Sequence, residues 1–438
     1  MIATWNALYW DDWAVYREGR QGTIKFFADC ARCAVPFRGE IEGLLVDPGP
    51  WLMRLLVFAF HPMIAFLTYR FLRRTQWLSR EEESIITLAA LLLPMFGARI
   101  ALIDYHYSFS LLLFTLGAWM ALSPHRATRL ASLAPIFWSM FTPSLQVFVT
   151  VLIGVLMTKL VLRQYAITLD RFLILVSLIL LPFVHRYGLN LIYPELAVKD
   201  GYNTIRLSFL IRAVLVAGTL TLPLVAITFR KRNGRVAQRP VVLLAIGLAV
   251  LAVGTFPYLS VGHFPNVSDW ILPLLPDQSD WNSRHQLLQP FGTAIIFLSI
   301  SQMMQYRRAF VVFVLVASIV LNVATYSSYY LDSLKQKAVL SYLSQNDDVL
   351  EEAVAVVVED SANDYNARNR AVRSYEWQAM VETKTRKELP VDSFSMDFCR
   401  TMKPDVILRI TPTGGRLKGL IQRRAAVNVT VERLTTCR

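Results

Sequence analysis

The chain has 438 residues, of which 54% are hydrophobic and 18% are charged. Its mean hydropathy of +0.40 is too high for an ordinary soluble enzyme, so the composition indicates a multi-spanning membrane protein. The formal net charge of +13 does not indicate a nucleic-acid partner, because the basic excess lies mostly in the short loops between apolar segments.

The first 50 residues precede the long apolar segments and contain the stretch WNALYWDDWAVY. Two adjacent carboxylates, Asp11 and Asp12, lie there between two tryptophans. Further on, apolar residues recur at helical spacing beside charges. This pattern predicts a short helix that ends at Pro36, either on the membrane surface or packed on the helical bundle. A polar segment of this length rarely crosses a membrane unaided, so we expect that Met1 is not the native start or that an earlier span has been lost.

Apolar segments of about the length that crosses a bilayer as a helix recur between Trp51 and Ser327. Basic residues gather in alternate connecting loops, and such loops stay in the cytoplasm, so residues 1–50 and the tail are expected outside. Pro143 predicts a turn that divides a segment too long for one crossing. The ten expected spans are 51–70, 84–102, 107–123, 128–142, 144–162, 171–186, 206–229, 241–259, 288–304 and 309–327.

The tail from 328 to 438 changes character and predicts a small extracytoplasmic α/β domain. VLEEAVAVVVEDSAND predicts a helix-to-strand segment or a strand, PDVILRITPTGG a strand and a turn, and AAVNVTVERL another strand. The expected organisation is therefore a first loop over residues 1–50, a transmembrane helical domain over 51–327 and a soluble domain over 328–438.

The four cysteines all lie outside the expected spans, in a compartment that permits disulfides. We favour a disulfide between Cys399 and Cys437. Cys30 and Cys33 form a CxxC motif, which is a weak metal or redox signal without a second pair and is otherwise a further disulfide candidate.

Ionisable residues gather near the expected outer membrane face. Arg99 and Arg212 lie inside expected spans, where a charge is costly unless it is paired or lines a polar cavity, while Arg54 is interpreted as an interfacial anchor. A carboxylate can take a proton from a hydroxyl nucleophile, and arginines can hold a phosphate leaving group. Together these groups favour sugar transfer from a lipid-phosphate carrier. The other candidates at this face are Asp11, Asp12, Asp104, His106, Arg186, Arg206, Arg284 and His285.

With these features the sequence resembles the GT-C superfamily of membrane glycosyltransferases, which take sugars from polyprenyl-phosphate carriers. The resemblance rests on YWDDW and the amphipathic stretch after it, IDYHY in the next outer loop, proline-broken apolar spans, SRHQLLQPFG after a long late loop, and the soluble tail. It covers nearly the whole chain as architecture. The amino terminus departs from the pattern, because these enzymes normally have a first span before the acidic loop.

The resemblance implies that Asp11 or Asp12 is the general base, and that Asp104 with His106 forms a second polar site that orients the acceptor or shares the proton. One base and a phosphate leaving group imply a single displacement that inverts the anomeric carbon. The residues expected to hold the donor phosphate are Arg284 and His285, with Arg99, Arg186, Arg206 and Arg212 as lesser candidates.

The expected partners are a polyprenyl-phosphate-linked sugar donor, a glycan, lipid or protein acceptor and the bilayer of the plasma (inner) membrane, with the active site outside the cytoplasm. No cofactor is certain, although Asp11 and Asp12 are a candidate site for Mg or Mn, which prefer oxygen ligands. The pair can also be a helix cap or a solvated turn. Two other functions stay open, a lipid-linked sugar transporter or flippase and a non-catalytic envelope assembly protein.

Overall fold

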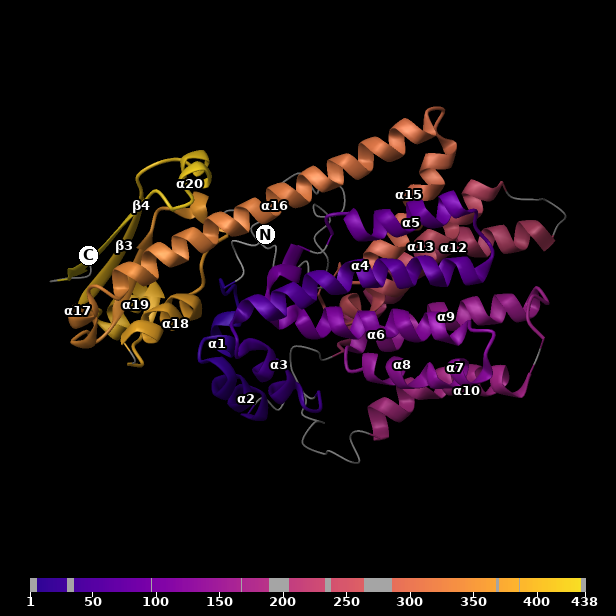
Figure 1. The fold of residues 1–438 in the computed structure, drawn as a ribbon, viewed down its shortest axis with the longest axis horizontal. Helices are drawn as coiled ribbons and strands as arrows, with labels where there is room; N and C mark the ends of the chain where they lie inside the picture. The colour runs from indigo at the N-terminus through magenta and orange to yellow at the C-terminus, as the bar shows by residue number, and fades with distance from the viewer. Residues whose placement is uncertain are drawn as a thin grey trace.

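The computed structural model shows a mostly helical protein with a small sheet near its carboxyl end (Figure 1). The part of the chain that it describes contains five helices long and apolar enough to cross a membrane. This confirms the expected class, a helical membrane-type fold with a small α/β region, but not the count of ten spans. The five helices are α4 Pro50–Thr75, α9 Pro143–Val161, α12 Leu207–Arg232, α13 Arg239–Ser260 and α16 Arg307–Leu343. The described residues are 6–29, 35–95, 97–166, 168–188, 205–232, 238–263, 286–367, 370–385 and 387–434.

Four further helices fill the bundle but are shorter. Three of them occupy expected spans, and α9 begins at Pro143 as the predicted turn requires. The expected span 84–102 is wrong, because its helix ends at Leu92 and two short 3₁₀ turns, η2 Gly97–Ile100 and η3 Leu102–Asp104, follow. Pro94 explains the break, since the residue before a proline is forced out of helical geometry. The four helices are α5 Arg80–Leu92, α6 Tyr105–Ala121, α10 Leu169–Phe183 and α15 Gln289–Met303.

The expected span 128–142 is also wrong. The chain forms two short helices there, α7 Arg126–Ala131 and α8 Leu133–Ser139. Pro135 in the first turn of α8 has no backbone N–H to continue the preceding helix, so α7 and α8 are separate. The second of them packs closely on α6, because a Cβ added at Gly117 would lie 2.5 Å from a side-chain carbon of Ile136.

Helices α13 and α15 cross at contact distance. A Cβ added at Gly292 would lie 2.5 Å from the backbone nitrogen of Leu251, which cannot move aside. Gly292→Ala is therefore expected to push the two helices apart and to lower the free energy of unfolding by about 1–3 kcal/mol. Thermal unfolding in detergent measures the change, with Gly154→Ala on α9 as the control, since no atom lies within 4 Å of the added Cβ there. Equal unfolding temperatures for the two variants would contradict this packing.

The carboxyl-terminal domain contains a four-stranded sheet with strand order β2-β1-β3-β4. The central strands are parallel, and the last strand is antiparallel to its neighbour. Three of the strands were predicted from alternation, and these predictions are confirmed. The elements are α17 Asp347–Glu351, β1 Val356–Asp360, α18 Ser374–Thr385, β2 Val391–Ser393, α19 Met396–Met402, β3 Val406–Pro412, α20 Arg416–Gln422 and β4 Val427–Arg433.

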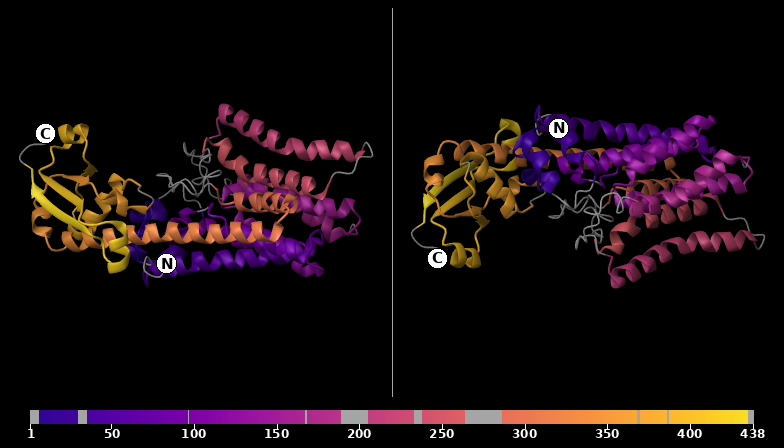
Figure 2. Two further views of the ribbon diagram at one scale, coloured as in Figure 1. Left: turned by 90° about the horizontal axis from the view of Figure 1, so that it is seen from above. Right: turned by 90° about the horizontal axis from the view of Figure 1, so that it is seen from below.

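A single helix joins the bundle to this domain. Helix α16 has 37 residues, so at 1.5 Å per residue it is about 55 Å long and exceeds the apolar thickness of a bilayer by about 25 Å. The expected domain boundary at residue 328 therefore falls inside a continuous helix, although the apolar composition changes there. Figure 2 shows α16 running from the bundle along the side of the carboxyl-terminal domain.

The described part of the amino-terminal segment, residues 6–29 and 35–50, folds between the bundle and the carboxyl-terminal domain (Figure 1). The predicted amphipathic helix corresponds to α2 Gly19–Asp29, and a further helix that was not predicted, α3 Arg38–Val46, packs on it. Contact between them is close, since a Cβ added at Gly43 would lie 3.2 Å from the backbone oxygen of Arg20. Helix α1 Asp12–Tyr16 precedes them and begins inside the paired-aspartate motif.

Candidate functional site

The two adjacent aspartates lie in different environments. Asp12 is fully buried, and its Oδ2 accepts the backbone N–H groups of Tyr9 at 3.1 Å and Leu102 at 3.0 Å, while Oδ1 accepts that of Ile103 at 2.9 Å. Burial raises the pKa of Asp12 to about 7, although Arg54 and the three N–H donors lower it. Asp12 thus joins the amino-terminal segment to the turns before α6, which is a structural role.

Arg54 strengthens the same connection. Its guanidinium is buried, with Nε donating to the Ile100 carbonyl at 3.1 Å and an Nη donating to the Ala7 carbonyl at 2.7 Å. It also lies 5.5 Å from the ring centroid of Tyr9. The interpretation of Arg54 as an interfacial anchor is therefore wrong, because a residue with 1% exposure cannot reach the membrane surface.

Asp11 is partly exposed and faces the carboxyl-terminal domain. The Tyr375 hydroxyl, from α18, donates a hydrogen bond of 2.9 Å to Asp11 Oδ1. Burial and the Asp11 charge raise the pKa of Tyr375, so this hydroxyl keeps its proton at neutral pH. Of the two predicted bases, Asp11 is the one whose carboxylate a substrate can approach.

The residue before Asp11 has an uncommon backbone conformation. Trp10 has φ +51°, which bulky residues rarely adopt, and its ring and backbone N–H are held in place. The N–H donates to Glu376 Oε2 at 3.1 Å, and the guanidinium of Arg370 lies 5.2 Å from the centroid of its ring. The orientation of Asp11 thus depends on contacts with the carboxyl-terminal domain.

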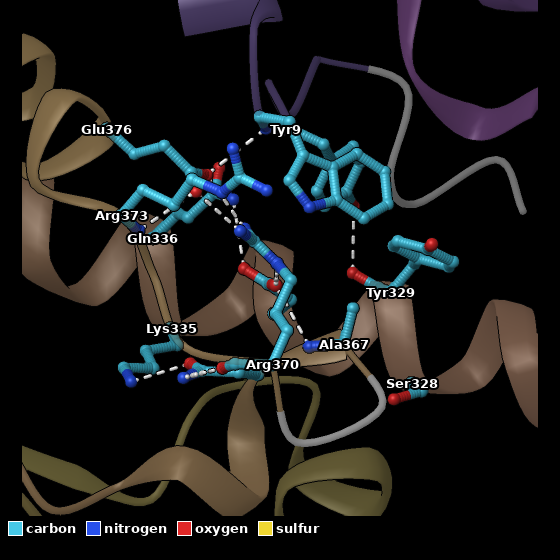
Figure 3. Close-up of polar contacts among 12 residues, drawn as sticks. Tyr9, Ser328, Tyr329, Lys335, Gln336, Ala367, Arg370, Arg373 and Glu376 are labelled. Atoms are coloured by element: carbon cyan, nitrogen blue, oxygen red, sulfur yellow. Dashed lines mark hydrogen bonds and ion pairs between the residues drawn. The ribbon is translucent and has the colours of Figure 1, made fainter. Parts of the chain in front are cut away.

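A buried charged network connects this segment to α16 and α18 (Figure 3). Arg370 donates two hydrogen bonds to Glu376, of 2.6 and 2.9 Å, and one of 3.1 Å to Asp332 on α16. Glu376 in turn holds Trp10, while Gln336 on α16 donates to the carbonyl of Leu8 at 2.9 Å. We call Asp332, Arg370 and Glu376 the junction triad. All three side chains are at most 2% exposed, so they fix the carboxyl-terminal domain against the amino-terminal segment.

A second buried cluster lies beside the turns before α6. Glu42 accepts hydrogen bonds from the Tyr16 hydroxyl at 2.5 Å and from Arg38 Nε at 2.8 Å, and Arg38 also donates to the Ile103 carbonyl at 3.2 Å. Burial raises the pKa values of Glu42 and Tyr16. These residues were not singled out in the sequence, although the i, i+4 spacing of Arg38 and Glu42 was a signal for a helical ion pair.

Asp104 and His106, the predicted second polar site, are both buried at the start of α6. Asp104 directly follows the residues that Asp12 holds, whereas a ring nitrogen of His106 lies 3.3 Å from the Thr142 hydroxyl and 3.5 Å from the Ser110 hydroxyl. The structure therefore brings Asp104 near Asp12 in the fold but places the side chains of Asp104 and His106 away from solvent.

The predicted phosphate-binding arginines that the structure describes lie in different environments. Arg99 is buried and donates to the Tyr326 hydroxyl and, at 2.9 Å, to Asn322 Oδ1, both on α16. Three further arginines are exposed: Arg186 lies in the π-helical turn Val184–Gly188 after α10, Arg206 directly before α12, and Arg212 within α12. Arg284 and His285 lie outside the described residues, so their role stays a prediction.

A pocket lies between α4, α5 and α15, and its cavity volume is about 40 Å³. Its lining is mostly apolar and includes Leu93 and Phe291. Three polar residues also line it, His61, Thr68 and Arg99. A cavity of this volume has room for only a few water molecules, so a larger ligand would have to widen it. Arg99 thus connects this pocket to α16.

The aspartate pair does not fit a divalent cation. Both oxygens of Asp12 already accept backbone N–H groups, which leaves Asp11 as a single ligand. Within the ranges that the structure describes, no three His, Cys, Asp or Glu side chains gather as a metal site.

Cys399 is disulfide-bonded. Cys30, Cys33 and Cys437 lie outside the described residues, so the pairing of Cys399 with Cys437 stays a prediction.

Comparisons with known proteins do not identify a family. No protein-family model matches the chain, and no curated protein or solved structure matches it.

Proposed function

We propose that this protein is an integral membrane glycosyltransferase of the GT-C type, which transfers a sugar from a polyprenyl-phosphate carrier to a cell-envelope acceptor. Asp11 is the general base. Arg99, together with Arg284 and His285, holds the donor phosphate. The reaction takes place outside the cytoplasm, beside the carboxyl-terminal domain.

One observation supports this proposal above the others. Asp12 holds its own segment and the turns before α6 together, so Asp11 and Arg99 belong to one rigid unit. Arg99 lies three residues before Leu102, whose backbone N–H binds Asp12. The Cα atoms of Arg99 and Leu102 are therefore at most about 11 Å apart. The candidate base and the candidate phosphate-binding arginine are therefore connected through Asp12 at the end of the membrane-type helices.

The residues that line the pocket are of the kinds that a lipid-linked donor needs. A polyprenyl phosphate needs an apolar wall for its chain and a cation for its head group, and the lining contains Leu93 and Phe291 for the first and Arg99 for the second. The pocket would have to open between the helices to admit the chain. Arg99 keeps donor capacity for such a phosphate because a guanidinium carries five N–H groups.

The proposed step needs no enzyme nucleophile. Asp11 takes the proton of an acceptor hydroxyl as its oxygen forms a bond to the anomeric carbon of the sugar, and the bond from that carbon to the phosphate oxygen breaks. The electron pair leaves with the polyprenyl phosphate, whose added charge the arginine stabilises. Attack from the side opposite the phosphate inverts the anomeric carbon.

Sugar transfer by the purified full chain in liposomes tests the proposal. Radiolabelled polyprenyl-phosphate hexoses and pentoses serve as donors, with crude envelope glycan, lipid and protein fractions as acceptors. Asp11→Asn is expected to lower the transfer rate by about 10² or more, because the amide cannot accept the proton. Its unfolding temperature should stay near that of the wild type, since Asp11 is partly exposed.

The matched control is Asp47→Asn, which alters an exposed carboxylate in the same amino-terminal region and should transfer normally. Normal transfer by Asp11→Asn would exclude Asp11 as the base. If the folded wild type consumes no donor, the enzyme class itself is wrong, and transport or assembly becomes the better account.

A further inference from the structure

Helix α20 presents two large apolar side chains to the surroundings. Leu417 is 70% exposed and Ile421 is 73% exposed, and their i, i+4 spacing puts them on one face of the helix. Gly419 lies on the opposite face, where an added Cβ would be 2.9 Å from the Tyr365 ring and 3.2 Å from the side chain of Leu331. The helix thus packs on the domain through Gly419 and directs its apolar face outward.

Basic residues surround this face. The segment RLKGLIQRR, residues 416–424, contains four basic and no acidic residues, and of the four Lys418, Arg423 and Arg424 are exposed. Two exposed aliphatic side chains flanked by exposed basic residues are typical of a surface that contacts an anionic membrane.

The position of α20 agrees with such a contact. Arg416 donates a hydrogen bond of 3.0 Å to Ser328 of α16, and Gly419 packs beside Leu331. The apolar stretch of α16 that is expected to cross the membrane ends at Ser327. Both contacted residues of α16 lie within four positions of Ser327, so they are at most about 6 Å further along the helix. The head-group layer of a bilayer extends about 5–8 Å beyond its apolar core. Figure 1 shows α20 beside α16, at the end of the carboxyl-terminal domain nearer to the bundle.

We propose that α20 docks on the bilayer that α16 crosses, with Leu417 and Ile421 entering the head-group region and Lys418, Arg423 and Arg424 binding anionic lipid phosphates. This contact gives the carboxyl-terminal domain a second attachment to the membrane surface. The proposal does not depend on sugar transfer.

Hydrogen exchange of the full chain in lipid nanodiscs tests the contact. One set of nanodiscs contains phosphatidylcholine alone, and the other contains phosphatidylcholine with about 30% of the anionic lipid phosphatidylglycerol. Backbone amides of residues 415–424 are expected to exchange roughly tenfold more slowly in the anionic nanodiscs, because lipid contact suppresses local opening of this short helix. Equal exchange in the two lipid mixtures would overturn the proposal.

Two variants separate the parts of the surface. Leu417→Ser combined with Ile421→Ser, and Lys418→Gln combined with Arg423→Gln and Arg424→Gln, should each abolish the difference between lipid mixtures. The control, Met402→Ser with Lys403→Gln, alters an exposed apolar and a basic residue at the end of α19 and should preserve the difference. If both α20 variants preserve it, or if soluble anionic glycan protects α20 as well as lipid does, the membrane is not the partner.

Discussion

Replacing Arg370 with methionine is expected to cost about 3–5 kcal/mol of stability and to separate the carboxyl-terminal domain from the amino-terminal segment. The substitution leaves Asp332 and Glu376 buried without their shared cation, and an uncompensated buried charge is strongly destabilising. Burial lowers the pKa of Arg370, but the two carboxylates raise it further than burial lowers it, so the guanidinium stays charged. Thermal unfolding in detergent measures the loss, and limited proteolysis should show early cleavage between α16 and α18.

A matched control lies in the same domain. Arg409 also bridges two carboxylates, Glu359 and Glu432, but all three side chains are more than 40% exposed, so Arg409→Met should leave the unfolding temperature nearly unchanged. The variant that combines Arg370→Met with Asp332→Asn and Glu376→Gln should recover part of the loss, since it removes the unpaired charges. If this combined variant is no more stable than Arg370→Met, the cause is lost packing rather than buried charge.

Asp12 is expected to make the protein less stable as the pH rises from about 4 to about 7. An unfolded aspartate releases its proton near pH 3.9, whereas burial raises the pKa of folded Asp12 to about 7. Between these values the folded state holds a proton that the unfolded state has lost. Raising the pH therefore favours unfolding, by at most about 1.4 kcal/mol per pH unit.

Thermal unfolding of the wild type and of Asp12→Asn across this range measures the contribution of Asp12. The variant is expected to be less stable at pH 5, because its amide presents a donor where the carboxyl accepts backbone N–H groups. The difference between the two proteins should shrink as the pH rises. Asp47→Asn, which alters an exposed group, should follow the wild type throughout. Parallel profiles for wild type and Asp12→Asn would show that Asp12 does not titrate in this range.

The long helices and the strands were predictable because each depends on a local pattern. Mean hydropathy and length indicate α4 and α13, and alternation of apolar residues indicates β3 and β4. The wrong spans share one physical cause, since Pro94 and Pro135 interrupt backbone hydrogen bonding within segments whose hydropathy alone looks continuous. The continuation of α16 past residue 328 was not predicted, because the composition becomes more polar there while the backbone stays helical.

The candidate site was predictable only in part. The paired aspartates stood out, but their division into a buried Asp12 and a partly exposed Asp11 depends on backbone donors about 90 residues further along the chain. Arg54 resembled many interfacial arginines, and Glu376 follows no motif at all, so neither could be assigned before the fold brought their partners together. Which charged residues meet across a long sequence separation depends on the tertiary structure and cannot be inferred from a local pattern.

The length of α16 has a mechanical consequence. A transmembrane helix tilts to match the thickness of its bilayer, and a helix without a break transmits that tilt along its whole length. With about 25 Å of α16 beyond the membrane, a change in tilt of about 10° displaces its far end by about 4 Å. Because the junction triad attaches both the carboxyl-terminal domain and the amino-terminal segment to α16 near the start of this extension, the two are expected to move with the helix as one body when the thickness of the membrane changes.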